Sequence, residues 1–411
     1  MSQKVDVCII GAGAAGLAAA NALDPRLRIC LIDKNEIPGR KILAAGGGRC
    51  NLTNAACSRH QETLDFFRGL GLETAADEEG RYYPYSGCAV DVAEALVNGL
   101  AGRDVCWILP AEVISVDPEH AKATEAQDQT EGEDGPCFRV SWVRRSGKKG
   151  LPEDILPGAA PFGSESEVIA DRVILCTGGK AAPVFGTTGD GYRLARSLGH
   201  GVSRVYPILT GIRCLLPKQL AGIRARGIVR LLEDGVCIAK ETGQIQFTPE
   251  GLSGICIFDL TLHIRLREGE KPADGFARYQ VEVDLAPDFA AEEVVRRASS
   301  FGIVTRKLAE AVPPEKLKCW RLPVERVWGW DKAQCTAGGV EREQINPETM
   351  ESLLCPGLFF AGELLDRQGP CGGYNLQNAW ETGLRAAREI SRRTADSCRC
   401  MSGAGKQTTE R

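Results

Sequence analysis

The stretch from Lys4 to Asp33 constrains the fold more than any other part of the sequence. It reads as a short apolar strand, a glycine-rich turn, an alanine-rich helix and a second apolar strand that ends in an acid. The GxGxxG turn permits a tight bend, lets a pyrophosphate approach the backbone and allows close helix–strand packing, while the acid accepts a ribose hydroxyl. The helix N-terminus would meet the phosphates with its positive end. The predicted dinucleotide contacts are Gly11, Gly13, Ala14, Ala15, Gly16 and Asp33.

The rest of the chain indicates that this domain is interrupted by an insertion. Short apolar runs typical of buried parallel strands recur at 170–179 and 354–363, each followed by a glycine-rich turn and a helix. Between them, 203–255 read as short strands and turns, and 290–312 have helical spacing. The chain is therefore predicted to be an α/β protein. Its predicted parts are a discontinuous Rossmann-like domain at 1–202 and 335–411 and an inserted β-rich and helical unit at 203–334.

A β-meander is expected inside the first segment of the nucleotide-binding domain. Residues 104–117 read as a strand pair that opens the meander, with further strands at 137–143 and 167–176. The loops between them are rich in Glu, Gly, Pro and Lys and are predicted to be exposed to solvent. The helix that starts near Leu376 is predicted to end before the polar residues 396–411, which are predicted to be disordered.

Composition excludes several classes of function. The net charge of −4 argues against a broad nucleic-acid surface, so no nucleic-acid partner is predicted. No run reaches the roughly 18 apolar residues of a membrane span, and the first residues enter a strand at once, so we expect a cytoplasmic protein. The 17 cysteines are scattered and the 4 histidines are not paired, so no metal site is predicted. The sequence gives no prediction of the oligomeric state.

Three features favour FAD over NAD as the bound cofactor. The chain carries one fingerprint only, the strand that ends in TGG follows the meander, and a late strand ends in AGELLD. In two-dinucleotide-domain flavoproteins, strands of this kind return past the cofactor. Ligands collect at the carboxyl ends of such strands. The predicted contacts here are Val113, Thr177, Gly178, Gly179, Gly362, Glu363 and Asp366.

The segment LAAGGGRCNLTN, residues 43–54, admits three interpretations: a spacer, a phosphate cradle, or a redox site built on Cys50. Cys50 lacks a CxxC partner and a nearby histidine, which argues against a redox role. We favour a loop that approaches the flavin, in which glycines remove side chains next to the cofactor. The residues predicted to contact the cofactor in this loop are Gly46, Gly47, Arg49 and Asn51, and those predicted just before it are Lys34, Arg40 and Lys41.

Longer motifs carry a resemblance to a known family. Residues 38–54 read PGRKILAAGGGRCNLTN and residues 372–377 read GGYNLQ, and both resemble the BaiN/YhiN-like flavoproteins. The resemblance extends along most of the chain. It implies bound FAD, a Rossmann-like domain, and an inserted β-barrel with a helical subdomain. It also implies reduction of ring double bonds conjugated to a 3-ketone, with an apolar steroid or bile acid as substrate.

Such a reaction needs donors where negative charge develops on the ketone oxygen, and a source of a proton. The candidate catalytic residues are Arg49, Tyr82 and Tyr374, with Tyr83 as a further donor, although tyrosines at such positions also serve as packing residues. Trp328 and Trp330, two apart on an expected strand, could line the steroid pocket or pack between domains. The predicted contacts in the turn before the last helix are Gly373, Tyr374, Asn375 and Leu376.

Other functions remain open from the sequence. An oxidase of a small amine or ketone, a fumarate-reductase-like flavoprotein and a flavin-binding or RNA-associated protein without turnover all fit a single fingerprint. With one fingerprint, NADH or NADPH as the electron donor would dock transiently near the flavin. The resemblance implies an FAD-dependent reductase acting on CH–CH groups, with NAD(P)H as donor.

Overall fold

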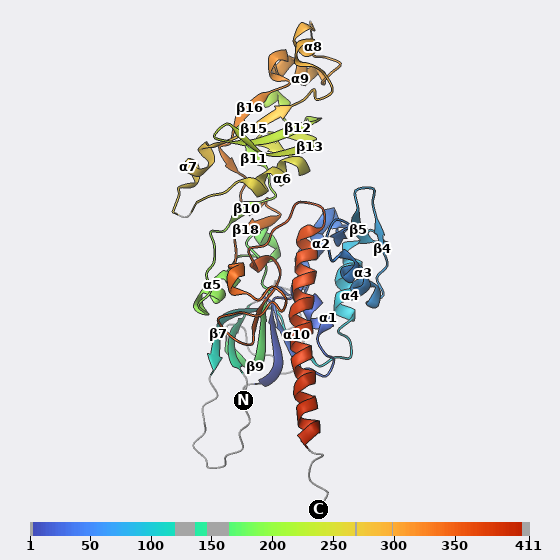
Figure 1. Ribbon diagram of the computed structural model, residues 1–411, viewed down its shortest axis with the longest axis vertical. Coiled ribbons are helices and arrows are strands. Elements are labelled where there is room, and N and C mark those ends of the chain that lie inside the picture. Colours follow the sequence, from blue (N-terminus) through green and yellow to red (C-terminus); the bar gives the residue numbers. More distant parts are fainter. Residues whose placement is uncertain (1–2, 120–135, 146–163, 268, 298, 405–411) are drawn as a thin grey trace, which may run out of the picture.

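The inserted unit lies above the nucleotide-binding domain in the computed structural model, and one long helix follows the side of the lower domain (Figure 1). The structure describes residues 3–119, 136–145, 164–267, 269–297 and 299–404. The solvent loops expected between the meander strands, and the last residues of the expected disordered tail, lie outside these ranges.

One seven-stranded sheet forms the centre of the nucleotide-binding domain. Its order is β6-β2-β1-β9-β8-β7, and β19 pairs with the C-terminal part of β9. Strands β6, β2, β1, β9 and β19 are parallel, and all but the partly buried edge strand β6 contribute buried residues to the core, which explains their continuous apolar runs. Strand β8 pairs antiparallel with both β7 and β9, so the meander extends this same sheet. The strands are β1 (Gln3–Ile10), β2 (Ile29–Ile32), β6 (Val105–Ile108), β7 (Ala111–Glu119), β8 (Cys137–Arg144), β9 (Glu165–Leu175) and β19 (Leu358–Phe360).

The expected strand pair at 104–117 is divided between two parts of this sheet. Strand β6 pairs with β2 in parallel, and only β7 belongs to the meander. The chain turns between them at Leu109 and Pro110, where the proline has no amide hydrogen to donate to a ladder.

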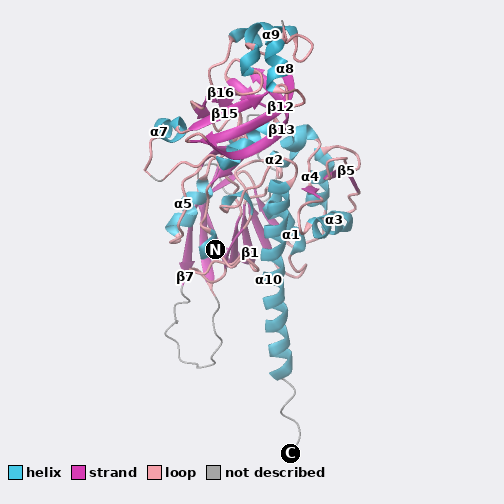
Figure 2. Ribbon diagram, turned by 45° about the horizontal axis from the view of Figure 1, so that its top comes forward, coloured by secondary structure: helices cyan, strands magenta, loops and turns pink. Residues whose placement is uncertain are grey.

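Helices α1 and α10 lie along one flank of the central strands and α5 along the other (Figure 2). The first two touch closely, because a Cβ at Gly383 of α10 would lie 2.3 Å from the carbonyl oxygen of Ala15. Helix α10 continues to Ala404, beyond the predicted end, and Arg392 pairs with Asp396 on its surface at 2.9 Å. None of the helices described is long and apolar enough to cross a membrane. The helices of this domain are α1 (Ala14–Ala22), α2 (Arg40–Ala44), α3 (His60–Gly69), α4 (Ala89–Asn98), α5 (Asp190–Ser197) and α10 (Tyr374–Ala404).

A small three-stranded sheet joins the end of the motif at 38–54 to residues 80–84, which read GRYYP. Its order is β3-β5-β4, so Thr53 and Asn54 pair with Tyr82 and Arg81. The strands are β3 (Thr53–Asn54), β4 (Thr74–Ala76) and β5 (Arg81–Pro84). This pairing brings the segment after the glycine run next to the GRYYP segment.

The inserted unit is connected to the lower domain by a ribbon of two strands, β10 and β18. Beyond the ribbon, seven strands form an antiparallel sheet in the order β16-β15-β12-β13-β14-β11-β17. The strands are β10 (Tyr206–Ile208), β11 (Ile212–Arg213), β12 (Arg224–Glu233), β13 (Val236–Thr248), β14 (Gly251–Ser253), β15 (Tyr279–Asp284), β16 (Trp320–Pro323), β17 (Arg326–Val327) and β18 (Cys335–Ala337). The helices are α6 (Ile255–Leu260), α7 (Pro272–Ala277), α8 (Ala291–Arg296) and α9 (Arg306–Ala311).

The structure agrees with one expectation about the inserted unit and corrects another. Residues 320–327 pair with β15 through β16 and with β11 through β17, so this segment joins the two ends of the sheet and closes it, as the barrel implied by the resemblance requires. The helix expected at 290–312 is two short helices, α8 and α9. Gly302 has φ +99°, a left-handed value that a continuous right-handed helix cannot contain. Val294 and Leu308 of the two helices are both buried in the core of the unit, which preserves the apolar spacing that predicted one helix.

A buried histidine makes the stability of the lower domain depend on pH. His200 is 3% exposed, its Nε2 lies 2.8 Å from Ser352 Oγ, and burial lowers its pKa. Because the unfolded chain then binds the proton more readily, the free energy of unfolding should fall as the pH drops below about 6.5, by up to about 1.4 kcal/mol per pH unit. We expect His200→Gln to flatten the melting temperature between pH 7.5 and 5.5. If the melting temperature falls equally with pH in the wild type and in His200→Gln, His200 is not the cause of the pH dependence.

Candidate functional site

A cavity of about 670 Å³ opens where the strands of the central sheet end and the glycine-rich segments meet. Its volume lies within the range of roughly 300–1,000 Å³ that is usual for ligand sites, and it occupies the position where open α/β sheets bind ligands. The predicted contacts that line it are Gly11, Gly13, Ala14, Ala15, Asp33, Lys34, Arg40, Lys41, Gly46, Gly47, Arg49, Asn51, Val113, Thr177, Gly178, Gly362, Glu363, Gly373, Asn375 and Leu376.

The three fingerprint glycines have different roles in the structure. Gly11 has φ +114°, and a Cβ there would lie 2.5 Å from the carbonyl oxygen of Cys176. At Gly16 a Cβ would lie 1.9 Å from the carbonyl oxygen of Gly11, so this glycine permits the packing of α1 on β1 and does not itself line the cavity. A Cβ at Gly13 would meet nothing within 4 Å, because this position faces the cavity. The free amides of the first turn of α1 are therefore open to a ligand.

Asp33, the acid of the fingerprint, directly follows β2. Its Oδ2 accepts a hydrogen bond from the Ala12 amide at 2.7 Å and its Oδ1 accepts one from the Asn35 amide at 2.7 Å. Burial raises the pKa of this carboxyl, against the effect of those hydrogen bonds. The carboxylate thus holds the glycine turn against the next loop and has further lone pairs for a ligand hydroxyl.

The glycine run after α2 forms a bend that faces the cavity. Gly46, Gly47 and Gly48 have φ values of +58°, +67° and +87°, which side chains other than glycine rarely adopt. Cys50 is fully buried behind the bend, burial raises the pKa of its thiol to about 12, and it does not line the cavity. A thiol kept neutral away from the ligand space has no basis for redox reactivity, so the structure favours the interpretation as an approach loop.

Three of the predicted cationic contacts, all except Arg49, already have hydrogen-bonding partners inside the protein. Lys41 Nζ lies 2.8 Å from Glu363 Oε2, and although burial alone would lower the pKa of this lysine, the carboxylate raises it above its usual range. Lys34 pairs with Asp190, and Arg40 donates to Asn35 Oδ1 at 3.2 Å. Since Glu363 also accepts the Thr336 amide at 2.9 Å, the ion pair joins α2 to the segment after β19 and to β18.

Two buried polar atoms in the cavity wall lack partners among the described residues, Asn51 Oδ1 and Thr177 Oγ1. Unpaired buried polar groups are costly, so this wall fits a ligand that supplies hydrogen bonds. FAD supplies a ring N–H, ribityl and ribose hydroxyls and phosphate oxygens. Together with the open space above Gly13 and Gly47, these atoms make the residues present suitable for FAD.

The GGYNLQ motif forms the wall opposite the fingerprint and anchors it. A Cβ at Gly373 would lie 2.6 Å from the carbonyl oxygen of Thr53, so the chain crosses β3 closely there. Gln377, 2% exposed, accepts hydrogen bonds from the hydroxyls of Thr53 at 2.6 Å and Thr63 at 2.8 Å. The motif therefore fixes the segment that carries Asn51 relative to α10.

Several predicted site residues lie elsewhere. Tyr82 stacks on His60, with 6.0 Å between ring centroids, and side chains alternate along β5, so Tyr83 lines the cavity and Tyr82 does not. The ring of Tyr374 packs over Gly369, and Asp366 accepts the Ser203 hydroxyl at 2.8 Å. The others outside the cavity wall are Gly16, Gly179, Trp328 and Trp330.

The two tryptophans follow a strand that ends earlier than expected. Strand β17 ends at Val327, so Trp328 and Trp330 do not share a strand face. Trp328 covers Gly211, where a Cβ would lie 2.4 Å from the ring, and Lys180 lies 5.1 Å from the centroid of the Trp330 ring. Both are packing residues near the ribbon between the two parts of the chain.

Arg49, one of the predicted donors, lies over the ring of Tyr83, with its guanidinium carbon 4.7 Å from the centroid.

The sequence did not single out several other polar residues that line the cavity. Arg81 belongs to the GRYYP segment, and it lies at the cavity because β5 pairs with β3. The missed lining residues with polar side chains include Asn35, Arg81, Gln334, Arg367, Cys371 and Asn378. They are scattered over four segments, and only the fold brings them together.

The chain is similar to a known family and to characterised proteins over most of its length. A family model described as the HI0933-like protein Rossmann domain matches residues 5–64 and 160–389. A 3-dehydro-bile acid delta(4,6)-reductase from Clostridium scindens is 32% identical over 94% of this chain and 98% of that protein. A ribosomal RNA dihydrouridine synthase from Escherichia coli is 25% identical over 94% of this chain and 98% of that protein.

The fold is similar to that of a solved flavoprotein. The 3-ketosteroid delta1-dehydrogenase from Sterolibacterium denitrificans, in complex with 1,4-androstadiene-3,17-dione, has a TM-score of 0.52 at 12% identity, covering 95% of this chain and 100% of that one. At that identity the likeness concerns the fold. Because the family model covers more than half of the chain and a relative is 32% identical over nearly all of it, the chain belongs to the HI0933-like family of Rossmann-domain flavin oxidoreductases.

Proposed function

We propose that this protein reduces a carbon–carbon double bond conjugated to a carbonyl group, with NAD(P)H as the source of electrons. The acceptor we propose first is a steroid or bile acid with a 3-oxo-4,6-diene, because a bile-acid reductase is 32% identical over nearly the whole chain. The observation that carries the proposal is that one cavity is lined both by the nucleotide fingerprint and by Arg49 and Tyr83.

The cavity residues suit the demands of such a reaction. FAD, when bound and reduced, supplies a hydride to the far carbon of the conjugated system. Negative charge then develops on the carbonyl oxygen, and Arg49 has donors free to meet it because its guanidinium is exposed and rests on an aromatic ring. A proton must reach the carbon next to the carbonyl. In the cavity wall, Tyr83 contributes a hydroxyl and Cys371 a thiol, and both are hydrogen-bearing groups.

The uracil ring of RNA is a second candidate acceptor. Two relatives, from Escherichia coli and Haemophilus influenzae, are ribosomal RNA dihydrouridine synthases, each 25% identical to this chain. Uracil also contains a double bond conjugated to a carbonyl, so hydride at C6 and a proton at C5 would complete the same reaction. The amide side chains of Gln334 and Asn378 in the cavity wall could pair with the imide edge of such a ring.

Anaerobic turnover tests the proposed function. The yellow protein is reduced with NADH or NADPH and then mixed with a 3-oxo-4,6-diene steroid, with uridine-containing RNA, or with neither. We expect a conjugated acceptor to reoxidise it and air to do so slowly. Fast oxidation by air alone would favour an oxidase, and failure of both nicotinamides to reduce it would remove NAD(P)H as donor.

Arg49 gives the matching mutational prediction. Arg49→Ala should lower the rate of acceptor reduction about 10²–10³-fold, because an oxyanion donor is lost, while FAD content and reduction by NAD(P)H remain unchanged. Arg59→Ala serves as a control, since Arg59 is a neighbouring arginine that does not line the cavity. Equal losses in both half-reactions would assign Arg49 to cofactor binding.

A further inference from the structure

The outer face of the inserted sheet is the side opposite its hydrophobic core. Buried residues such as Val229 and Ile245 mark the core side of β12 and β13. Side chains alternate along a strand and residues paired across a ladder share a face, so the ladders assign the opposite face. There Arg226 pairs with Gln244, Arg230 pairs with both Lys240 and Glu282, and Glu282 pairs with Arg321. The basic residues of this outer face are Arg224, Arg226, Arg230, Lys240 and Arg321.

The acids on the outer face are already neutralised. Glu282 pairs with Arg230 at 3.1 Å and with Arg321 at 3.0 Å, and Asp284 pairs with Lys318 at 3.0 Å. In contrast, Arg224, Arg226 and Lys240 are exposed and have no ion pair or hydrogen-bond partner within the described residues. Across the ladder Arg224 and Arg226 lie beside the neutral amides Gln246 and Gln244, and Lys240 lies beside a further cation, Arg230. The face is therefore positive and polar.

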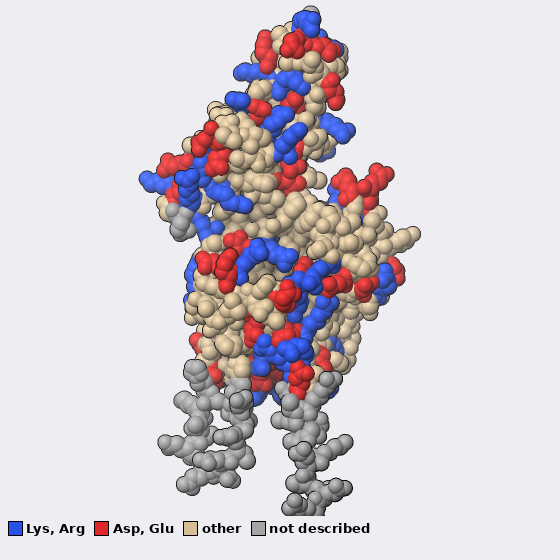
Figure 3. Space-filling view, viewed as in Figure 1, with Lys and Arg blue, Asp and Glu red and all other residues tan. Residues whose placement is uncertain are grey.

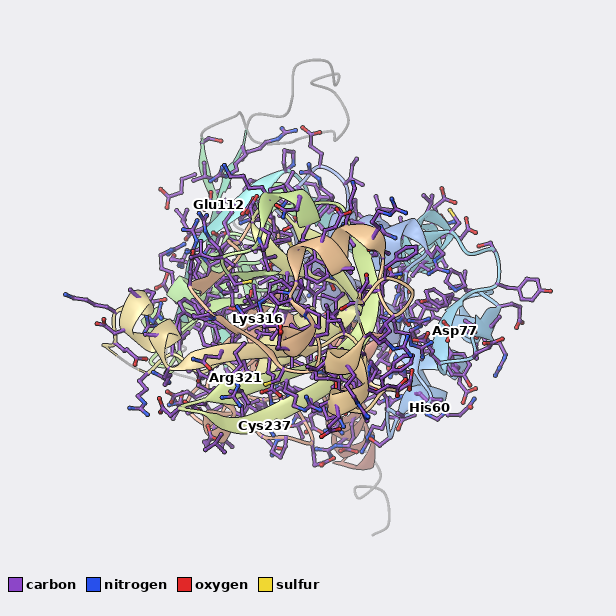
Figure 4. All side chains as sticks on the ribbon, turned by 90° about the horizontal axis from the view of Figure 1, so that it is seen from above. His60, Asp77, Glu112, Cys237, Lys316 and Arg321 are labelled. Atoms are coloured by element: carbon purple, nitrogen blue, oxygen red, sulfur yellow. The ribbon has the colours of Figure 1, made fainter. Side chains whose placement is uncertain are left out.

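The charge is distributed unevenly along the chain. Residues 203–334 contain 20 Lys and Arg against 17 Asp and Glu, and the rest of the chain contains 30 against 37. The inserted unit is therefore net positive although the whole chain is net negative. The prediction of no nucleic-acid partner used only the charge of the whole chain. Figure 3 shows Lys and Arg side chains over the front of this unit, where Figure 1 places β12 and β13. Figure 4, seen from above, shows Arg321 and Cys237 toward the same edge of the unit.

We propose that this outer face binds the phosphate backbone of a folded RNA. Exposed arginines and lysines with hydrogen-bonding side chains between them fit a phosphate backbone, to which such contacts supply most of the affinity. The inference rests on the proposed reduction of a conjugated double bond and makes the uracil ring of RNA its acceptor. The C5–C6 double bond of the base would become a single bond by gaining a hydride at C6 and a proton at C5, where bound reduced FAD would supply the hydride and NAD(P)H the electrons that reduce the cofactor again.

The position of the face sets a requirement on the RNA. Helix α6 packs on the core side of β13, where Cys256 lies beside Gly243, and Ile255 at its start lines the cavity. The cavity and the basic face are therefore on opposite sides of the inserted sheet. A trinucleotide that enters the cavity is too short to reach the face as well, whereas a folded RNA can contact both.

The test compares the FAD-loaded protein with a triple variant, Arg224→Gln, Arg226→Gln and Lys240→Gln. The probes are unmodified ribosomal RNAs of both subunits, transcribed in vitro, and a uridine trinucleotide. We expect the triple variant to bind the ribosomal RNA about tenfold or more weakly, with the slope of log K against log salt lowered by about 2–3. Dihydrouridine formation should fall in the RNA and remain unchanged in the trinucleotide.

A matched triple variant controls for the loss of charge. Arg196→Gln, Lys307→Gln and Arg342→Gln remove three exposed basic residues outside the face and should leave RNA binding unchanged. Equal affinity and salt slope for the wild type and the face variant would overturn the inference. A face-dependent preference for DNA or for vesicles of anionic lipid would also overturn it. If RNA binding depends on the face but neither uridine nor dienone is reduced, the docking stands and the proposed function fails.

Discussion

Gly16→Ala should produce a protein that is destabilised and retains little FAD. A Cβ at this position would lie 1.9 Å from the carbonyl oxygen of Gly11 and 3.0 Å from Cys176 Sγ, so α1 must move away from β1. Overpacking of this kind costs about 1–3 kcal/mol or more. Since the same helix presents its first amides to the cavity, its displacement also weakens the cofactor site. The ratio of flavin to protein absorbance and the melting temperature of the apoprotein measure the two effects.

Gly13→Ala separates cofactor binding from folding. Gly13 has φ −87°, which alanine adopts without strain, and its Cβ would meet no protein atom within 4 Å. The apoprotein should therefore melt like the wild type, while the new methyl group in the cavity lowers FAD affinity about tenfold for each 1.4 kcal/mol lost. An apoprotein of Gly16→Ala as stable as that of Gly13→Ala would show that α1 accommodates the contact.

Glu381→Ala should lower the free energy of unfolding by about 1–3 kcal/mol, because it removes the carboxylate to which the largely buried guanidinium of Arg385 donates. Glu381 is 8% exposed and lies 2.8 Å from Arg385, 3.6 Å from Arg367 and 3.9 Å from Arg59. Arg367 lines the cavity, so the variant should also reduce FAD retention. Denaturant unfolding with a flavin readout and a circular-dichroism readout would follow both changes.

Asp396→Ala is the matched control on the same helix. It removes a carboxylate that pairs with Arg392 at 2.9 Å, but both side chains are more than half exposed. Such a pair contributes about 0.3–0.5 kcal/mol, so the control should remain close to the wild type. A loss for Glu381→Ala of the same small size would mean that water reaches the arginines around it.

The local parts of the fold could be predicted because their causes are local. The spacing of Gly11, Gly13 and Gly16 between two apolar runs specifies a strand, a turn and a helix whatever the rest of the chain does. The glycine run at 46–48 predicted a loop without side chains next to the cofactor, and the left-handed φ values of these residues are a second local reason for glycine there. The insertion was visible because strand spacing replaced the pattern of buried parallel strands.

The remainder depends on contacts between distant segments. Lys41 and Glu363 are separated by 322 positions, and no local pattern indicates that they pair. The choice between Tyr82 and Tyr83 required knowing which side of β5 faces the cavity. The apolar spacing at 290–312 was real, but it is produced by two helices that pack on one core. The basic face was hidden because its residues become neighbours only through the ladders of β12, β13, β15 and β16.

The position of β19 determines when the protein can acquire its cofactor during synthesis. β19 fills the edge of β9 beyond the end of β8, and it begins at Leu358, followed directly by the cavity wall that contains Gly362 and Gly373. While the ribosome is still making the chain, this edge of β9 is open and the wall does not exist. Cofactor capture is therefore a step that follows translation. A nascent chain arrested before residue 358 exposes an apolar strand edge to chaperones and to its neighbours.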